Sequence, residues 1–173
     1  MEHLRPTMAA IDLAALRDNI AAVRAQIAPG CKMLAAVKGD AYGHGAVRCA
    51  RVLEEERVDW LGVALVEEGI ELRSAGINTR VLCLGGAGPR GAAAAIDHGL
   101  TPLISDLAEA RRLDRAAAER ATVAAVHVKV DTGMGRLGVP LHHWEHFLDR
   151  LADCTNLRVE GIASHFSESE HPD

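Results

Sequence analysis

Short apolar runs alternate with amphipathic stretches along most of the chain. Their starts recur at intervals of roughly 20–35 residues, which is the spacing of strand–helix units. Because the runs are apolar almost throughout, they predict strands covered on both faces, and hence an α/β protein with a parallel sheet. The six predicted strands lie at residues 32–38, 59–65, 79–84, 100–105, 123–131 and 157–166.

The stretches between these runs have the start signals of helices. Asp12 is a candidate cap for the first helix, SDLAE at 105–109 reads as a capping box, and Pro140 stands where a helix start tolerates proline. The predicted helices lie at residues 12–27, 45–57, 66–75, 105–120 and 140–153.

Right-handed connections between parallel strands give either an open doubly wound sheet or a closed barrel. A complete (β/α)8 barrel has eight strands and about 250 residues. This chain has 173 residues and six predicted strands. If the fold is a barrel, we expect residues 1–173 to form an incomplete one, whose open strand edges need a partner.

Composition narrows the classes of function. There are 19 basic and 24 acidic side chains, and no basic block longer than a doublet, which argues against a nucleic-acid partner. No run approaches the ~18–20 apolar residues that span a bilayer, and the charged start does not look like a secretory signal. We therefore expect a soluble, cytoplasmic protein without a membrane partner.

The four cysteines form neither a CxxC pair nor a close Cys/His cluster. This spacing predicts reduced thiols and no metal site. Cys31 lies beside the first predicted strand and Cys83 lies within the third, so we expect both to pack as small hydrophobic side chains.

In parallel α/β folds, functional side chains collect at the carboxyl ends of the strands. Lys38 closes the first predicted strand, residues 131–136 follow the fifth, and His165 closes the sixth. A lysine ending an apolar strand is unusual, because burying an ammonium without a partner is unfavourable. The alternative is a side chain that reaches back to solvent. Glu67 and Glu68, after the second strand, we interpret as solvated or capping residues.

Three motifs resemble the alanine racemase family of fold-type III pyridoxal-phosphate enzymes. They are AVKGDAYGHG around Lys38, HVKVDTGMGRLG at 127–138 and GIASHF at 161–166, and the opening RPTMAAIDLAALRDNI is similar too. The resemblance covers essentially the whole chain, departing mildly at Gly39, where the family more often has alanine. It implies an incomplete (β/α)8 TIM-type barrel with about six of eight strands, the carboxy-terminal β-domain being absent.

The resemblance also implies roles for individual residues. Lys38 would be catalytic: it would carry pyridoxal 5'-phosphate as a Schiff base and then act as the base on one face of the substrate's Cα. Tyr42 would lie near the cofactor phosphate and His165 along the cofactor ring. Arg136 would contact the cofactor's phenolic oxygen and the substrate carboxylate, which suits a guanidinium fork. Met134 would add a backbone donor to the substrate.

Two of these residues are also compatible with a purely structural role. Tyr42 could face the core with its hydroxyl at the surface, and His165 could be a hydrogen-bonded core histidine. Lys129 matches a position that is carbamylated in some family members, where a carbamate would orient Arg136 through a charge-assisted hydrogen bond.

The function implied is interconversion of L- and D-alanine, supplying D-alanine for peptidoglycan. The family's second acid/base group is a tyrosine of the partner subunit in a homodimer, whereas the only tyrosine here is Tyr42. We therefore expect the chain to be inactive alone, as a fragment or as one half of a pair completed by a carboxy-terminal half. The alternatives are a related pyridoxal-phosphate racemase or decarboxylase of other specificity, a single-domain cofactor carrier, and a non-catalytic truncated remnant or interaction module.

Overall fold

A computed structural model describes residues 7–170 of the chain. Arg5 and Pro6 of the opening motif lie outside the described residues. So does His171, which the sequence marks as a solvated or capping residue.

All strands of the described residues belong to one parallel sheet. Its order is β1-β2-β3-β4-β5-β6, and β7 also pairs with β5. The α/β class and the parallel sheet predicted from the sequence are therefore confirmed. The strands are β1 (Leu34–Ala36), β2 (Trp60–Val63), β3 (Arg80–Cys83), β4 (Thr101–Ile104), β5 (Ala124–Asp131), β6 (Val139–Pro140) and β7 (Leu157–Ala163).

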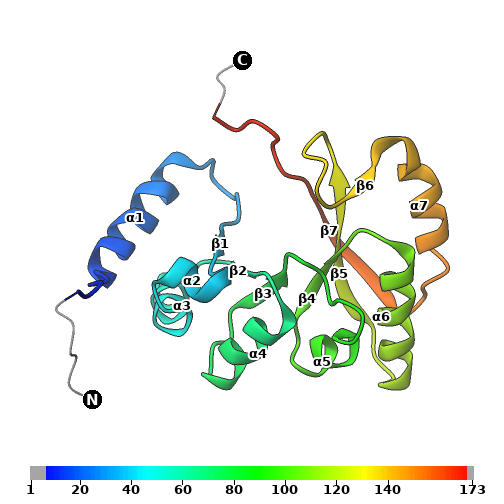
Figure 1. The fold of residues 1–173 in the computed structure, drawn as a ribbon, viewed down its shortest axis with the longest axis horizontal. Helices are drawn as coiled ribbons and strands as arrows, with labels where there is room; N and C mark the ends of the chain where they lie inside the picture. The colour runs from blue at the N-terminus through cyan, green and yellow to red at the C-terminus, as the bar shows by residue number, and fades with distance from the viewer. Residues whose placement is uncertain (1–6, 171–173) are drawn as a thin grey trace.

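Helices connect successive strands from β1 to β5, the 132–138 loop joins β5 to β6, and Figure 1 shows α4, α5 and α6 following one another along one side of the sheet. No helix within residues 7–170 is long and apolar enough to cross a membrane. The helices are α1 (Leu13–Gln26), α2 (Lys38–Gly43), α3 (Ala46–Glu55), α4 (Val66–Ser74), α5 (Ala92–Asp97), α6 (Leu107–Glu119), the 3-10 turn η1 (Leu141–His143) and α7 (Trp144–Leu151).

The six predicted strands are all present, but each is shorter than its apolar run. Just before β1 the backbone N–H of Met33 donates to the Asp59 carboxylate at 2.8 Å, and just after it Lys38 begins the next turn. The two-residue β6 was not predicted, because Val139 and Pro140 are too short a run to signal a strand.

The starts of α1 and α6 lie at or next to the predicted positions, because a capping side chain fixes each of them. The Asp12 carboxylate accepts from the backbone N–H groups of Ala14 and Ala15, so this predicted cap is confirmed. The predicted capping box begins one residue early: the cap of α6 is Asp106, which accepts from the Glu109 N–H at 2.7 Å.

One further prediction on local structure was wrong. Pro140 lies in β6, so α7 begins four residues later than expected, after η1. The GGAGPRG run at 85–91 forms a loop, as its composition indicates, and the short helix α5, which was not predicted, follows it at Ala92.

The cysteine predictions are partly confirmed. All four thiols are free. Cys83 is fully buried in β3, and burial raises its pKa to about 12. Cys31, however, is exposed, because it follows the turn at Pro29–Gly30, where its N–H bonds the Ala28 carbonyl before β1 begins.

Strands β2 and β4 are buried on both faces, in keeping with their apolar sequences, whereas β1 and β7 are largely exposed. Leu61, Ile104 and Leu113 belong to the large core between the sheet and the helices. Trp60 and Leu82 belong to a smaller cluster, together with Leu103 of β4. The alternation of side chains along a strand separates these two clusters.

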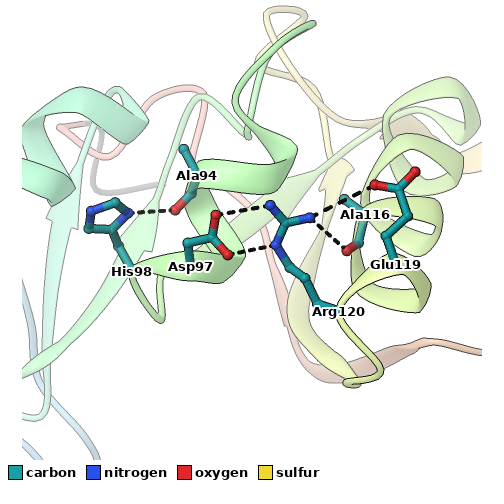
Figure 2. A network of polar contacts seen from close by, with 6 residues as sticks. All are labelled: Ala94, Asp97, His98, Ala116, Glu119 and Arg120. Carbon is teal, nitrogen blue, oxygen red and sulfur yellow. Dashed lines mark hydrogen bonds and ion pairs between the residues drawn. The ribbon is translucent and has the colours of Figure 1, made fainter.

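A polar network links the ends of α5 and α6 on the helical side of the sheet (Figure 2). The Arg120 guanidinium donates to both carboxylate oxygens of Asp97, at 2.6 and 2.9 Å, and to the Ala116 carbonyl at 3.1 Å. This pairing lowers the pKa of Asp97 and raises that of Arg120. Both side chains are open to water, so we assign the pair an orienting role rather than a large share of stability.

Replacement of Leu113 tests the large core. Its side chain is fully buried between α6 and the sheet, so Leu113→Ala should lower the free energy of unfolding by about 2–5 kcal/mol. Leu141→Ala removes the same atoms from a side chain that is 64% exposed and should change stability by less than about 1 kcal/mol. Urea unfolding of both variants measures the difference, and equal losses would contradict this packing.

Candidate functional site

The carboxyl ends of the strands share one rim of the sheet. The parallel register pairs Ala36 with Gly62, Val63 with Cys83, Ile104 with Val128 and Lys129 with Ala163. Three segments that are distant in sequence therefore emerge on the same side: Lys38 after β1, the 132–138 loop after β5, and Ser164–His165 after β7.

Lys38 opens a turn of unusual backbone conformation. It is half-buried, and the next four residues, Gly39, Asp40, Ala41 and Tyr42, have φ between 52° and 61°. The element labelled α2 is thus largely left-handed, which costs an L-residue about 1–2 kcal/mol per position. Only Gly39 escapes this strain, so the surrounding contacts must hold the turn in place.

Hydrogen bonds lock the turn at both ends. The Val37 N–H donates to the Gly62 carbonyl at 2.8 Å, which fixes the chain just before Lys38. At the far end, Asp40 accepts from two donors: its carbonyl from the Gly45 N–H at 2.9 Å and its carboxylate from the Ala46 N–H at 2.6 Å. The turn therefore presents the Lys38 side chain from a fixed base.

Tyr42 lies beside Lys38 on the turn. The Lys38 Nζ is 5.9 Å from the centroid of the Tyr42 ring, within the range of a cation–π contact. The Tyr42 side chain is 64% exposed, so the alternative of a core-facing ring is wrong. The Lys38 amine and the Tyr42 ring therefore lie close together at a place that is accessible to solvent.

The loop after β5 is organised by Asp131. Its carboxylate accepts from the N–H groups of Gly133 and Gly135, at 3.0 and 3.1 Å. These bonds hold the pKa of Asp131 below its usual value. Within this loop Met134 is half-buried and Arg136 is exposed, so the guanidinium is available to a ligand.

Lys129 is almost enclosed at the end of β5. Its side chain is 8% exposed, and burial lowers its pKa, with the positive charge of Arg136 acting in the same direction and Asp131 opposing both. The positive charges of Lys129 and Arg136 therefore act on one another.

His165 follows β7 and is exposed, so the alternative of a core histidine is wrong. Next to it, the Ser164 hydroxyl hydrogen-bonds the Thr132 hydroxyl at 2.5 Å. This contact joins the end of β7 to the loop that carries Arg136.

The predicted residues consequently form two groups on one rim. Lys38 and Tyr42 lie at the β1 end, whereas Lys129, Arg136 and His165 lie around β5 and β7. Strands β2, β3 and β4 stand between the groups along the sheet. Within the described part of the chain, no three His, Cys, Asp or Glu side chains are placed to hold a metal ion.

Two carboxylates that sequence reasoning did not place in the site support its loops. Glu68 caps α4, accepting from the N–H groups of Ala64 and Leu65 at 2.6 and 3.0 Å, and it also accepts from the Gly39 N–H at 2.6 Å. Glu109 is buried and accepts from the Ala87 N–H at 2.6 Å, in the loop after β3, and burial raises its pKa. Spacing signalled the cap at Glu68, but neither long-range contact.

Known proteins resemble this chain over most of its length. The sequence family described as “Alanine racemase, N-terminal domain” matches residues 11–173. An alanine racemase of Geobacter sulfurreducens is 46% identical over 169 residues, which cover 98% of this chain and 44% of that protein. The chain thus spans less than half the length of the curated relatives it matches.

Solved structures agree with the sequence comparisons. An alanine racemase of Clostridium difficile 630 superimposes with a TM-score of 0.93 and 34% identity, covering 99% of this chain and 48% of that one. The alanine racemase of Bacillus anthracis with bound L-Ala-P has a TM-score of 0.86 and 28% identity, over 94% of this chain and 42% of that one.

Gly138, the last glycine of DTGMGRLG, tests how the Arg136 loop is closed. It has φ 135°, and a Cβ there would lie 2.5 Å from the Asp131 backbone nitrogen. Gly138→Ala should therefore separate β6 from β5 and lower the free energy of unfolding by on the order of 3 kcal/mol.

The control for this variant is Gly135→Ala, in the same loop. Gly135 has φ 65° and open space around it, so alanine should cost about 1–2 kcal/mol in backbone strain alone. Urea unfolding compares the two variants. A Gly138→Ala loss no larger than that of Gly135→Ala would show that the close approach is unimportant.

Proposed function

This chain belongs to the alanine racemase family, and from that membership we propose that it holds pyridoxal 5'-phosphate on Lys38 and serves the interconversion of L- and D-alanine. The observation that carries the proposal is the pairing of the half-buried Lys38 amine with the exposed Tyr42 phenol, on a turn held at both ends. The D-alanine formed would supply peptidoglycan synthesis.

The donor set at the rim fits this cofactor. Lys38 supplies an amine for covalent attachment and Tyr42 a phenol that would donate to the phosphate. Arg136 and His165, both exposed, would face the ring and its oxygen. When bound, pyridoxal phosphate acts as an electron sink that makes the α-proton of an amino acid removable.

The chain's own residues would then handle substrate and proton. The Arg136 guanidinium would bind the alanine carboxylate in a forked geometry, with a backbone group of Met134 adding a donor. The Lys38 Nζ, released to act as a base, would accept the α-proton on one face of the carbon and return it. The turn from Gly39 to Tyr42 holds the backbone from which the Lys38 side chain extends.

Racemisation also needs an acid/base group on the opposite face. Tyr42 is the only tyrosine of the chain, and it belongs to the Lys38 side of the site. We propose that the second group comes from the part of the family's length that this chain does not span. The chain alone would then bind the cofactor without turning over alanine, in the cytoplasm as family members do, and would act as part of a dimer or with a complementing half.

The first test is covalent attachment of the cofactor to a lysine. Because the sequence has few lysines, the labelled residue can be identified without ambiguity. The sequence has three lysines, Lys32, Lys38 and Lys129. Lys32 is exposed and Lys129 is buried, so a reagent guided by exposure alone would label Lys32. After incubation with pyridoxal phosphate and reduction with borohydride, peptide mapping should find the cofactor on Lys38. Lys38→Arg should lose the label and Lys32→Arg should keep it. Labelling mainly at Lys32 would overturn the assignment.

Turnover is tested by reconstitution. The chain is mixed with the separately produced carboxy-terminal part of the Geobacter sulfurreducens relative, and D-alanine formation from L-alanine is followed. Activity that Lys38→Arg abolishes supports the proposal, and a preference for L-serine would favour a racemase of other specificity. A correctly labelled Lys38 without turnover in the mixture would favour a non-catalytic module.

We also propose that Lys129 carries a carbamate that orients Arg136. Carbamylation needs a neutral amine, and the lowered pKa of Lys129 makes that form more accessible near neutral pH. With 13C-labelled bicarbonate, a protein-bound carbamate resonance should appear near neutral pH and vanish on acidification. Lys129→Ala should lose the resonance, while Lys32→Ala retains it. A signal that survives in Lys129→Ala would contradict the proposal.

A further inference from the structure

The turn that presents Lys38 depends on contacts from outside itself. Asp40, Ala41 and Tyr42 are non-glycine residues in left-handed conformation, which a chain adopts only when its surroundings determine it. The bonds of Asp40 to Gly45 and Ala46 are local, and they tie the turn to the start of α3. They do not fix the turn relative to its neighbour β2–α4.

Glu68 makes that connection through a side chain. Its Oε1 accepts from the Gly39 N–H at 2.6 Å, directly after Lys38. Its Oε2 accepts from the N–H groups of Ala64 and Leu65, in the loop between β2 and α4. With one oxygen on each loop, the carboxylate spans two successive strand ends of the rim.

The carboxylate is itself held rigidly. Glu68 lies in the first turn of α4, where its charge is favourable to the helix N-terminus, and it is half-buried. Three backbone donors meet two oxygens in charge-assisted hydrogen bonds, which are stronger and more directional than neutral ones. A shift of Gly39 would therefore lose a short charge-assisted bond.

We propose that Glu68 is a positioning residue for Lys38: its carboxylate holds the Gly39 amide and so fixes the direction in which Lys38 leaves the end of β1. The inference rests on the proposed role of Lys38 as the cofactor lysine. A cap confined to α4 would need only the bonds to Ala64 and Leu65. The bond to Gly39 is what distinguishes positioning from capping.

The chain offers a matched control for the experiment. Glu109 occupies the same place in α6 as Glu68 in α4, the third residue of the helix, and it also accepts from a loop after a different strand, at Ala87. Glu109→Gln therefore disturbs an equivalent carboxylate without touching the Lys38 turn. Glu67→Gln, next to Glu68 and exposed, controls for the loss of one charge.

The measurement is the ratio of borohydride-trapped pyridoxal phosphate at Lys38 to that at Lys32 within the same molecules, which corrects for protein loss and unfolding. Glu68→Ala should lower this ratio roughly tenfold, the effect expected for one charge-assisted bond. Glu68→Gln, which keeps one acceptor oxygen, should fall between Glu68→Ala and the unmodified chain. Glu109→Gln and Glu67→Gln should leave the ratio unchanged. An unchanged ratio in Glu68→Ala, or an equal drop in Glu109→Gln, would overturn the proposal.

Hydrogen exchange at the Gly39 amide provides a second readout that needs no cofactor. Exchange should accelerate in Glu68→Ala and Glu68→Gln and stay slow in Glu109→Gln. If the unmodified chain shows no preference for Lys38 over Lys32, the proposed function fails. The proposed hold of Glu68 on the Gly39 amide is then tested by this exchange rate alone. Equal exchange in the Glu68 and Glu109 variants would then overturn it.

Discussion

Parallel pairing of the strands is the constraint on which the rest of the molecule depends. Because every pair in the described sheet runs in the same direction, the helical connections cross back over a face, and each strand delivers its last residue to the same rim. Lys38, Arg136 and His165 emerge on the same rim for this reason. Their sequence separation is irrelevant once the register aligns Lys129 with Ala163 and Ala36 with Gly62.

The sequence predicted what burial and periodicity decide. Six apolar runs became six strands. Asp12 caps its helix because its carboxylate accepts from a free backbone N–H group at the helix start. It did not predict the left-handed turn after Lys38. Local preference disfavours such a conformation for Asp40, Ala41 and Tyr42, and only contacts formed in the folded chain impose it. The prediction that Cys31 is buried was wrong for a related reason, because the turn before β1 places it at the surface.

The same limit explains why Glu68 and Glu109 were not predicted as part of the site. A glutamate in the first turn of a helix is an ordinary capping signal, and both residues satisfy it. Their second contacts reach loops that follow other strands, so these contacts exist only after the sheet has formed. The residue types at the rim indicated its chemistry. The hydrogen bonds of Glu68 and Glu109 that hold its loops depend on tertiary structure and could not be predicted from the sequence.

Two carboxylates hold loops of the rim in opposite electrostatic settings. At Asp131, the N–H groups of Gly135 and Gly133 favour the ionised form and lower the pKa. The stabilisation is present above the ordinary pKa of an aspartate and is lost as pH falls through the lowered value. At Glu109, burial raises the pKa, so the ionised form is the disfavoured one and folding gains as pH falls through that raised value. Acid therefore weakens the hydrogen bonds that Asp131 makes in the Arg136 loop. At the loop after β3, it removes the unfavourable burial of the Glu109 charge. The Arg136 loop is held by a carboxylate whose pKa is lowered and the loop after β3 by one whose pKa is raised, so a fall in pH acts on the two loops in opposite ways.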